Sequence, residues 1–304
     1  MAENQSMPTF LELPASTSTG KPPRIRVLPV PYEATVSYAP GTAHGPRAIL
    51  EASSQLELYD RTFGTEPCEI YGIETLPAFA IPGGSTQEVT QALAQWIQPL
   101  IEPERLLVGL GGEHTITVGL TRGTARALAN PITLVQIDAH GDLRDQYETE
   151  PYSHACVARR LLDKGVMELV LIGIRSLCTE EAEFISANDK RVHVHFAEDM
   201  HGDPTGIWRK NLAQQLKGRQ VYLTIDVDGL DPSVIAATGT PEPNGLSWQQ
   251  TVDAIDTVCR AAKVVGLDLV ELAPRPMLHA ADFATAKLAY VTMSHIARSR
   301  GWLA

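Results

Sequence analysis

Residues 132–145 read ITLVQIDAHGDLRD, and residues 221–232 read VYLTIDVDGLDP. In both stretches an apolar run without polar alternation ends abruptly in a group of carboxylates. Such runs are typical of strands that are buried on both faces of a parallel sheet. We therefore place these two near the sheet centre, with their carboxylates at the strand ends where α/β proteins bind ligands.

Six more short apolar runs predict strands. They cover residues Ile25–Val30, Glu69–Gly72, Leu106–Leu110, Leu169–Ile172, Val192–His195 and Val264–Leu269. Stretches with helical spacing lie between the runs, as in the helix face formed by Val89, Leu93, Trp96, Ile97 and Leu100. Eight strands alternating with helices predict a parallel α/β sheet covered on both faces. A TIM barrel has the same alternation and stays open as an alternative.

Composition narrows the class of partner. The 304-residue chain is 44% hydrophobic and 20% charged, and its formal net charge is −11. This charge disfavours nucleic acid or an anionic lipid surface as the main partner and suits a small cationic substrate. No apolar stretch approaches the roughly 18 residues of a spanning helix. We expect a protein without nucleic-acid or membrane partners.

The chain divides into an arm and one domain. Residues 1–23 are polar and rich in Pro, Ser and Thr, without a secretory signal, and predict a flexible N-terminal arm. Residues 24–304 contain no linker or repeat and predict a single catalytic domain. The four cysteines are far apart, which indicates reduced thiols and a cytoplasmic location.

Ionisable residues gather directly after four of the predicted strands. They are His114 in GGEH, then Asp138, His140 and Asp142 in DAHGD, Asp226 and Asp228 in DVDG, and Glu271 after GLDLV. Alternate residues of an extended chain share a side, so Asp138 points with His140 and Asp226 with Asp228. Burying these groups unpaired costs several kcal/mol for each charge, and a bound divalent cation offsets that cost.

The ligand types indicate the metal. Four carboxylates and two imidazoles are too rich in oxygen for a structural zinc site. They suit two ions of the Mn²⁺ type that share carboxylates and activate a water molecule. Asp231, before Pro232, fits a turn better than a ligand position. Glu113 and Asp145 fit supporting or surface positions, and His193 and His195 fit a partly exposed strand.

These motifs resemble those of the ureohydrolases, the family of arginase and agmatinase. The resemblance runs from GTAHGPRAI through GGEHT, DAHGDLRD, YSHA, TIDVDGLDP and DLVEL to ADFATAKLAYVTM. It implies a three-layer α/β/α fold of the arginase type with an eight-stranded parallel sheet. It also implies a homo-oligomer, commonly a trimer or hexamer.

The resemblance implies a role for each site residue. One Mn²⁺ would be held by His114, Asp138, Asp142 and Asp226, and the other by Asp138, His140, Asp226 and Asp228. Nickel or another divalent ion is an alternative. Asp142 would also transfer a proton, His154 would exchange protons with solvent, and Glu271 would hold the guanidinium group.

The substrate is inferred from the loop LRDQYETEPYS and the segment YSHACVARR. The loop lacks the Asn-rich pattern by which arginases bind an α-amino acid, and the segment is similar to prokaryotic agmatinases. We expect hydrolysis of agmatine to putrescine and urea, a step of polyamine biosynthesis, with Asp145, Glu148 and Glu150 as candidate attractants for the distal amine.

Several alternatives stay open. Guanidinobutyrase, arginase or another guanidine hydrolase would use the same metal site, and Arg144, Arg159 and Arg160 would favour a carboxylated substrate if they line the mouth. A non-catalytic metal-binding regulator is the alternative from another class. Glu113 stands where the family more often has Asp, and Gly141 where it often has a small hydroxyl residue, so both bear on substrate or metal preference.

Overall fold

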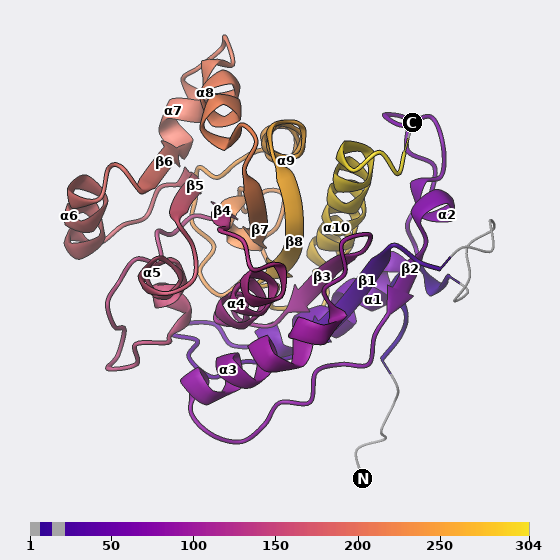
Figure 1. Ribbon diagram of the computed structural model, residues 1–304, viewed down its shortest axis with the longest axis horizontal. Coiled ribbons are helices and arrows are strands. Elements are labelled where there is room, and N and C mark those ends of the chain that lie inside the picture. Colours follow the sequence, from indigo (N-terminus) through magenta and orange to yellow (C-terminus); the bar gives the residue numbers. More distant parts are fainter. Residues whose placement is uncertain (1–6, 14–21, 304) are drawn as a thin grey trace.

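A computed structural model describes residues 7–13 and 22–303 of the chain (Figure 1). Its centre is an all-parallel sheet of eight strands in the order β2-β1-β3-β8-β7-β4-β5-β6. The strands are β1 (Ile25–Val30), β2 (Ile73–Thr75), β3 (Leu106–Gly111), β4 (Thr133–Ile137), β5 (Glu168–Ile174), β6 (Val192–Phe196), β7 (Gln220–Asp226) and β8 (Lys263–Val270). The sheet is open, with β2 and β6 at its edges, so the barrel alternative is wrong.

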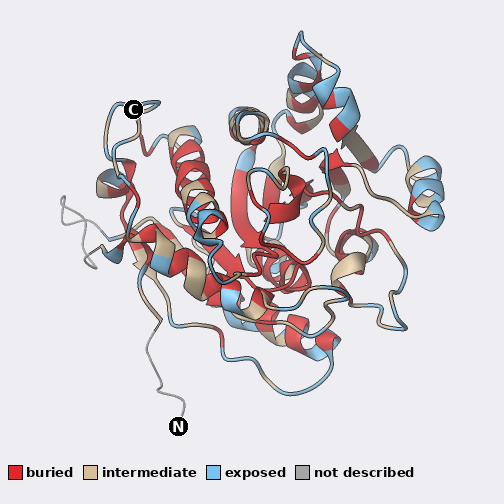
Figure 2. Cartoon of the chain, turned by 180° about the vertical axis from the view of Figure 1, so that it is seen from behind, coloured by how far each residue is buried: buried red, intermediate tan, exposed pale blue. Residues whose placement is uncertain are grey.

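Helices cover both faces of this sheet. The helices are α1 (Gly45–Ser53), α2 (Pro67–Tyr71), α3 (Thr86–Ile97), α4 (Ile116–Leu128), α5 (Val157–Asp163), α6 (Thr179–Ala187), α7 (Ala197–His201), α8 (Ile207–Leu216), α9 (Trp248–Ala261) and α10 (His279–Ser299). On one face α1, α10, α9 and α8 pack in sequence, and on the other α3, α4 and α5 do so. The strands between these layers are mostly buried (Figure 2), as expected of a three-layer α/β/α fold.

Seven of the eight predicted strands agree with the structure to within two residues. The strand predicted at Glu69–Gly72 is wrong, because Pro67 begins the short helix α2, which buries Cys68 and Tyr71 on one side. Gly72, with φ 65°, ends this helix, and β2 follows with three residues. Of the predicted α3 face, Val89, Leu93 and Ile97 are buried, whereas Trp96 is 39% exposed.

The predicted arm lies partly outside the described residues. In its described part, Phe10 and Leu11 are buried in the core that contains α1 and α10. The backbone N–H of Phe10 donates to Thr75 Oγ1, and that of Leu11 donates to Ser53 Oγ. Residues 7–13 are therefore docked on the domain.

Two further observations concern the whole described chain. All four cysteines are free thiols, as predicted, and three of them are buried. Within residues 7–13 and 22–303, no helix combines the length and apolarity needed to cross a bilayer.

Candidate metal centre

Four neighbouring strands bring the predicted site residues together. In the sheet order β3, β8, β7 and β4 are adjacent, and their carboxyl ends lead into His114, Glu271, Asp226 and Asp138. A glycine is needed where two of these ends meet, since a Cβ at Gly229 would lie 2.7 Å from the backbone nitrogen of Asp138. The predicted clusters therefore converge at the carboxyl ends of the four central strands.

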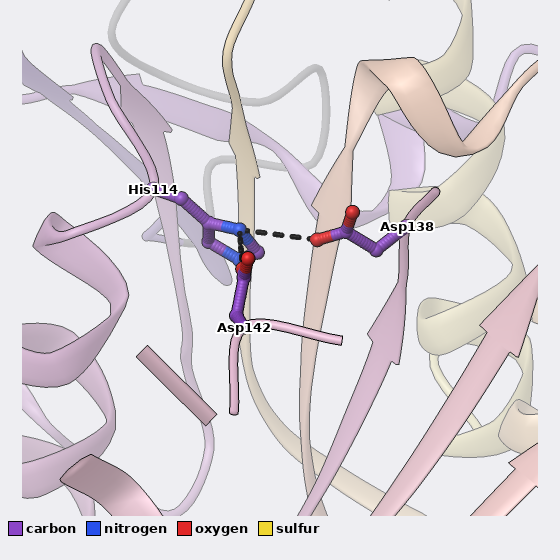
Figure 3. A group of neighbouring side chains, drawn as sticks. All are labelled: His114, Asp138 and Asp142. Atoms are coloured by element: carbon purple, nitrogen blue, oxygen red, sulfur yellow. Dashed lines mark ion pairs between the residues drawn. The ribbon is translucent and has the colours of Figure 1, made fainter. Parts of the chain in front are cut away.

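The first group of side chains surrounds His114 (Figure 3). Its Nδ1 lies 3.0 Å from Asp142 Oδ2, 3.2 Å from Asp138 Oδ2 and 3.4 Å from Asp226 Oδ2. All four residues are buried. Burial opposes protonation of His114, but the surrounding carboxylates outweigh it and raise the pKa of the imidazole well above its usual range. The group thus attracts a positive charge.

The hydrogen bond of the other ring nitrogen of His114, Nε2, shows what kind of cation fits beside Nδ1. Thr224 donates its hydroxyl hydrogen to Asp268, so its oxygen accepts from Nε2–H of His114 at 3.0 Å. In neutral His114 the lone pair then resides on Nδ1, which has no hydrogen-bond partner among the described residues although three carboxylates face it. A lone pair directed at carboxylate oxygens is stable only with a cation between them. The residues therefore fit a metal ion.

The second group lies around His140. His140 Nδ1 is 3.1 Å from Asp228 Oδ2 and 3.6 Å from Asp138 Oδ1. Asp138 is shared, because one of its oxygens faces His114 and the other faces His140. Two adjoining groups of potential ligands with a common carboxylate are what a two-ion site requires.

Sequence reasoning missed the residues that hold these ligands in place. Gln136 donates its amide to Asp138 at 2.8 Å and to Asp142 at 3.2 Å. Asp268, in the middle of β8, accepts hydrogen bonds from three buried hydroxyl groups, those of Thr117, Thr224 and Tyr222. Polar residues inside otherwise apolar strands were the available signal.

Two site residues have strained backbones. Asp142 has φ 50° and Glu271 has φ 66°, a region that residues other than glycine seldom adopt. Glu271 is buried and accepts a hydrogen bond from the backbone N–H of His114 at 2.6 Å. Burial, reinforced by the charge of Glu113, raises the pKa of Glu271 well above its usual range. This carboxyl group is held where a cationic ligand would stabilise its charge.

His154 begins the short 3-10 helix His154–Cys156 after the loop that follows Asp142. Its Nδ1 lies 3.1 Å from Thr35 Oγ1, and its ring makes a T-shaped contact with the ring of Tyr147. Burial, together with the charges of His114 and His140, lowers the pKa of His154 to about 4. An imidazole in this setting is neutral near pH 7 and is able to accept a proton.

The remaining candidates divide between surface and support. Asp231 caps a turn, accepting from the backbone N–H groups of Ser233 and Gly245, each at 3.0 Å. Asp145 is 63% exposed and pairs with Arg160 at 2.6 Å. Glu113 is fully buried beneath the chain segment that contains Thr35.

One cavity of about 240 Å³ connects the site to solvent. Its lining includes seven of the predicted residues, namely His114, His140, Asp142, His154, Asp226, Asp228 and Glu271. The lining also includes the less buried residues Tyr38, Arg144, Tyr147 and Cys178, which we call its rim. Arg144 packs over the ring of Tyr147, with its guanidinium carbon 5.1 Å from the ring centre.

The fold and this site define a class of protein, an α/β protein with clusters of His and Asp residues able to hold metal ions at the carboxyl ends of parallel strands. A family model described as the arginase family matches residues 23–297. The chain therefore belongs to the arginase family and is a ureohydrolase, a hydrolase of linear amidines.

Individual relatives support this assignment. An N(1)-aminopropylagmatine ureohydrolase of Synechocystis sp. is 41% identical over 295 residues, covering 96% of this chain and 94% of the relative. An agmatinase of Bacillus cereus is 32% identical, covering 83% and 84%. The crystal structure of the agmatine ureohydrolase of Thermoplasma volcanium superposes with a TM-score of 0.80 at 30% identity, covering 92% of each chain.

Proposed function

We propose that the protein hydrolyses a linear cationic guanidino amine of the agmatine class, releasing urea and an amine. The observation that carries the proposal is the position of Glu271, a buried carboxylate lining the same cavity as both metal-binding groups. A guanidinium group bound there faces the ligand cluster. The net charge of −11 favours such a cationic substrate electrostatically.

We assign the ligands as the sequence motifs suggest. His114, Asp138, Asp142 and Asp226 would hold one Mn²⁺, and Asp138, His140, Asp226 and Asp228 the other, with nickel as an alternative ion. Two divalent cations supply, when bound, the charge that makes water nucleophilic near neutral pH. The carboxylate ligands of this chain would fix the positions of these two cations.

The protein's own groups provide orientation and proton transfer. Glu271 binds the guanidinium through charge-assisted hydrogen bonds, which position its carbon for attack. Asp142, at the cavity wall, accepts a proton from the attacking water and passes it to the departing amine. His154, which also lines the cavity, exchanges protons between the site and solvent.

The relatives bear on the substrate. Agmatine, the substrate expected from the sequence, would give putrescine. Relatives that are 41% and 35% identical are named for N(1)-aminopropylagmatine, which carries a further aminopropyl group. We therefore propose N(1)-aminopropylagmatine as the first candidate substrate and agmatine as the second. The cavity is partly open, so the longer amine tail of the first candidate would extend towards the rim.

One observation favours a second candidate. Arg144 lines the cavity, whereas Arg159 and Arg160 contact Asp163 and Asp145. A cation at the mouth would suit the carboxylate of 4-guanidinobutyrate. The two candidates thus differ in the charge at the distal end of the substrate.

Urea release separates the candidates. Mn²⁺-loaded protein, with its metal content determined, is given N(1)-aminopropylagmatine, agmatine, 4-guanidinobutyrate and arginine in parallel. Preference for either polyamine precursor supports the proposal. Preference for 4-guanidinobutyrate supports the role of Arg144, and no urea from any of them by protein with two bound ions contradicts the proposed function. The cytoplasmic location and the homo-oligomer stay predictions.

A further inference from the structure

A chain of hydrogen bonds connects His154 to a buried carboxylate that the reaction does not use. Glu113 Oε2 accepts from the backbone N–H groups of Ala34 and Thr35 at 2.6 and 2.7 Å. Its Oε1 accepts from the hydroxyl of Thr35 at 3.0 Å. The oxygen of that hydroxyl lies 3.0 Å from the backbone nitrogen and 3.1 Å from Nδ1 of His154. The hydroxyl group of Thr35 therefore joins Glu113, which is 78 residues away in the sequence, to His154, which is 119 residues away.

The direction of each bond follows from the number of hydrogens. The Thr35 hydroxyl has one hydrogen, and the Glu113 carboxylate accepts it. Its two lone pairs then accept from the two nitrogens of His154, the backbone N–H and Nδ1–H. This contact with Thr35 requires Nδ1 to be the protonated nitrogen of the neutral ring, which leaves the free lone pair on Nε2, on the opposite side of the ring.

We propose that Thr35 and Glu113 are positioning residues that fix His154 in its Nδ1–H form and present a proton-accepting Nε2 to the cavity. This inference rests on the proposed function of His154. It explains why a fully buried Glu follows the glycines of GGEH, since its carboxyl group spans the gap to the segment that contains Thr35. The same contact holds the start of the segment 33–41, which continues into the rim residue Tyr38.

A competing hydroxyl makes the inference specific. Ser153 Oγ lies 3.3 Å from the same Nδ1 and accepts from the backbone N–H of Ala155 at 3.4 Å. Its hydrogen is free to donate to Nδ1, which would impose the opposite tautomer. The shorter contact to Thr35, whose hydrogen is already committed to Glu113, decides between the two.

The tautomer is measured directly by ¹⁵N spectroscopy of histidine-labelled, Zn²⁺-loaded protein, with His154→Asn used to identify the His154 signals. We expect Nδ1–H in the wild type and in Thr35→Ser. In Glu113→Gln an amide N–H replaces the acceptor, so the Thr35 hydroxyl turns to donate to Nδ1, and we expect the Nε2–H form. In Thr35→Val the share of Nδ1–H falls.

Turnover provides the second readout. Both Thr35→Val and Glu113→Gln are expected to lower kcat about 10- to 100-fold, the usual effect of removing a hydrogen bond that orients a functional imidazole. In Thr35→Val, KM and metal content should stay within about twofold of the wild type, and Thr35→Ser should restore kcat. Thr42→Val is the matched control, because this hydroxyl, directly after the segment 33–41, donates to Glu33 and has no hydrogen bond to His154.

The outcomes separate this inference from the proposed function. An Nε2–H signal in the wild type, an unchanged tautomer in both Thr35→Val and Glu113→Gln, or a tautomer controlled by Ser153→Ala would overturn the inference. If His154→Asn turns over as fast as the wild type, the proposed role of His154 fails, while the spectra still decide the effect of Thr35. A loss of kcat in Thr42→Val equal to that in Thr35→Val would also count against it.

Discussion

Replacing Glu271 by glycine and by alanine tests whether the site stores backbone strain. With φ 66°, this residue occupies a region that costs an L-residue about 1–2 kcal/mol relative to its right-handed counterpart. Glycine adopts it freely. The side chain is held there because its carboxylate accepts the backbone N–H of His114 at 2.6 Å.

The difference between the two variants isolates the strain. Both lose the carboxylate and leave the His114 N–H unpaired, a cost of about 1–3 kcal/mol that is common to both. Glycine also gives the unfolded chain more freedom, which favours alanine by about 0.4–1 kcal/mol. Glu271→Gly should therefore be more stable than Glu271→Ala by roughly 0.5–1 kcal/mol.

Thermal unfolding of the chelator-treated variants measures the difference, which amounts to about 2 °C in a chain of this size. The pair Val265→Gly and Val265→Ala is the control, since Val265 lies in β8, the strand that Glu271 directly follows, and is not among the described residues with positive φ. There alanine should be the more stable residue. An alanine variant at position 271 as stable as the glycine variant would refute the argument from strain.

Measuring activity tests whether the charge of Glu271 binds the substrate. Glu271→Gln keeps an acceptor for the His114 N–H but loses the charge that we propose holds the guanidinium. Hydrogen bonds to a charged group contribute about 1.5–3 kcal/mol each, so kcat/KM should fall roughly 100-fold or more, while stability stays near that of the wild type. Unchanged kcat/KM would remove Glu271 from substrate binding.

Three further predictions concern the ligands, their support and the helical layer. Asp226→Ala should release metal and abolish urea formation, as measured by metal analysis and turnover on one sample, and retention of both would contradict the ligand assignment. Thr224→Val, which removes the acceptor of His114 Nε2–H, should weaken metal affinity about 10- to 100-fold in a metal titration, and an unchanged affinity would count against this support. Burial raises the pKa of Asp256, but the hydrogen bond from Arg260 and the nearby charges outweigh it and lower that pKa below its unfolded value. Its ionised form therefore stabilises the fold above about pH 4 and loses this effect as the pH falls. Asp256→Asn should destabilise by about 1 kcal/mol at pH 7, and in denaturant titrations the difference from the wild type should shrink steadily as the pH falls below about 4.

The sequence predicted the central fold well because the site and the sheet share one pattern. An apolar run followed by carboxylates defines both the strand and its carboxyl end, as at Asp138 and Asp226. The edge of the sheet near β2 was harder to predict from the sequence. The run at Glu69–Gly72 has the composition of a strand, but Pro67 and the requirement to bury Tyr71 make it a helix, and only tertiary packing decides between the two.

Supporting contacts could not be predicted from spacing. Gln136 and Asp268 lie within apolar runs, and the alternation of a strand places Gln136 on the side of Asp138, but spacing does not show which groups either side chain contacts. Thr35 is 78 residues from Glu113 and 119 from His154. The pairing of β1 with β3 brings Thr35 near Glu113, whereas His154 comes from the loop after β4, so these contacts depend on the strand order of the whole sheet.

The two histidines of the site follow one rule with opposite results. In each case a threonine hydroxyl stands between an imidazole and a buried carboxylate, and the carboxylate takes the only hydroxyl hydrogen. At His114 the threonine accepts from Nε2–H, which leaves Nδ1 directed at the carboxylates as a metal ligand requires. At His154 it accepts from Nδ1–H, which in our inference leaves Nε2 to exchange protons. A ligand and a proton carrier can therefore be built from the same three groups, an imidazole, a hydroxyl and a carboxylate, and the ring nitrogen that the threonine contacts decides which of the two results.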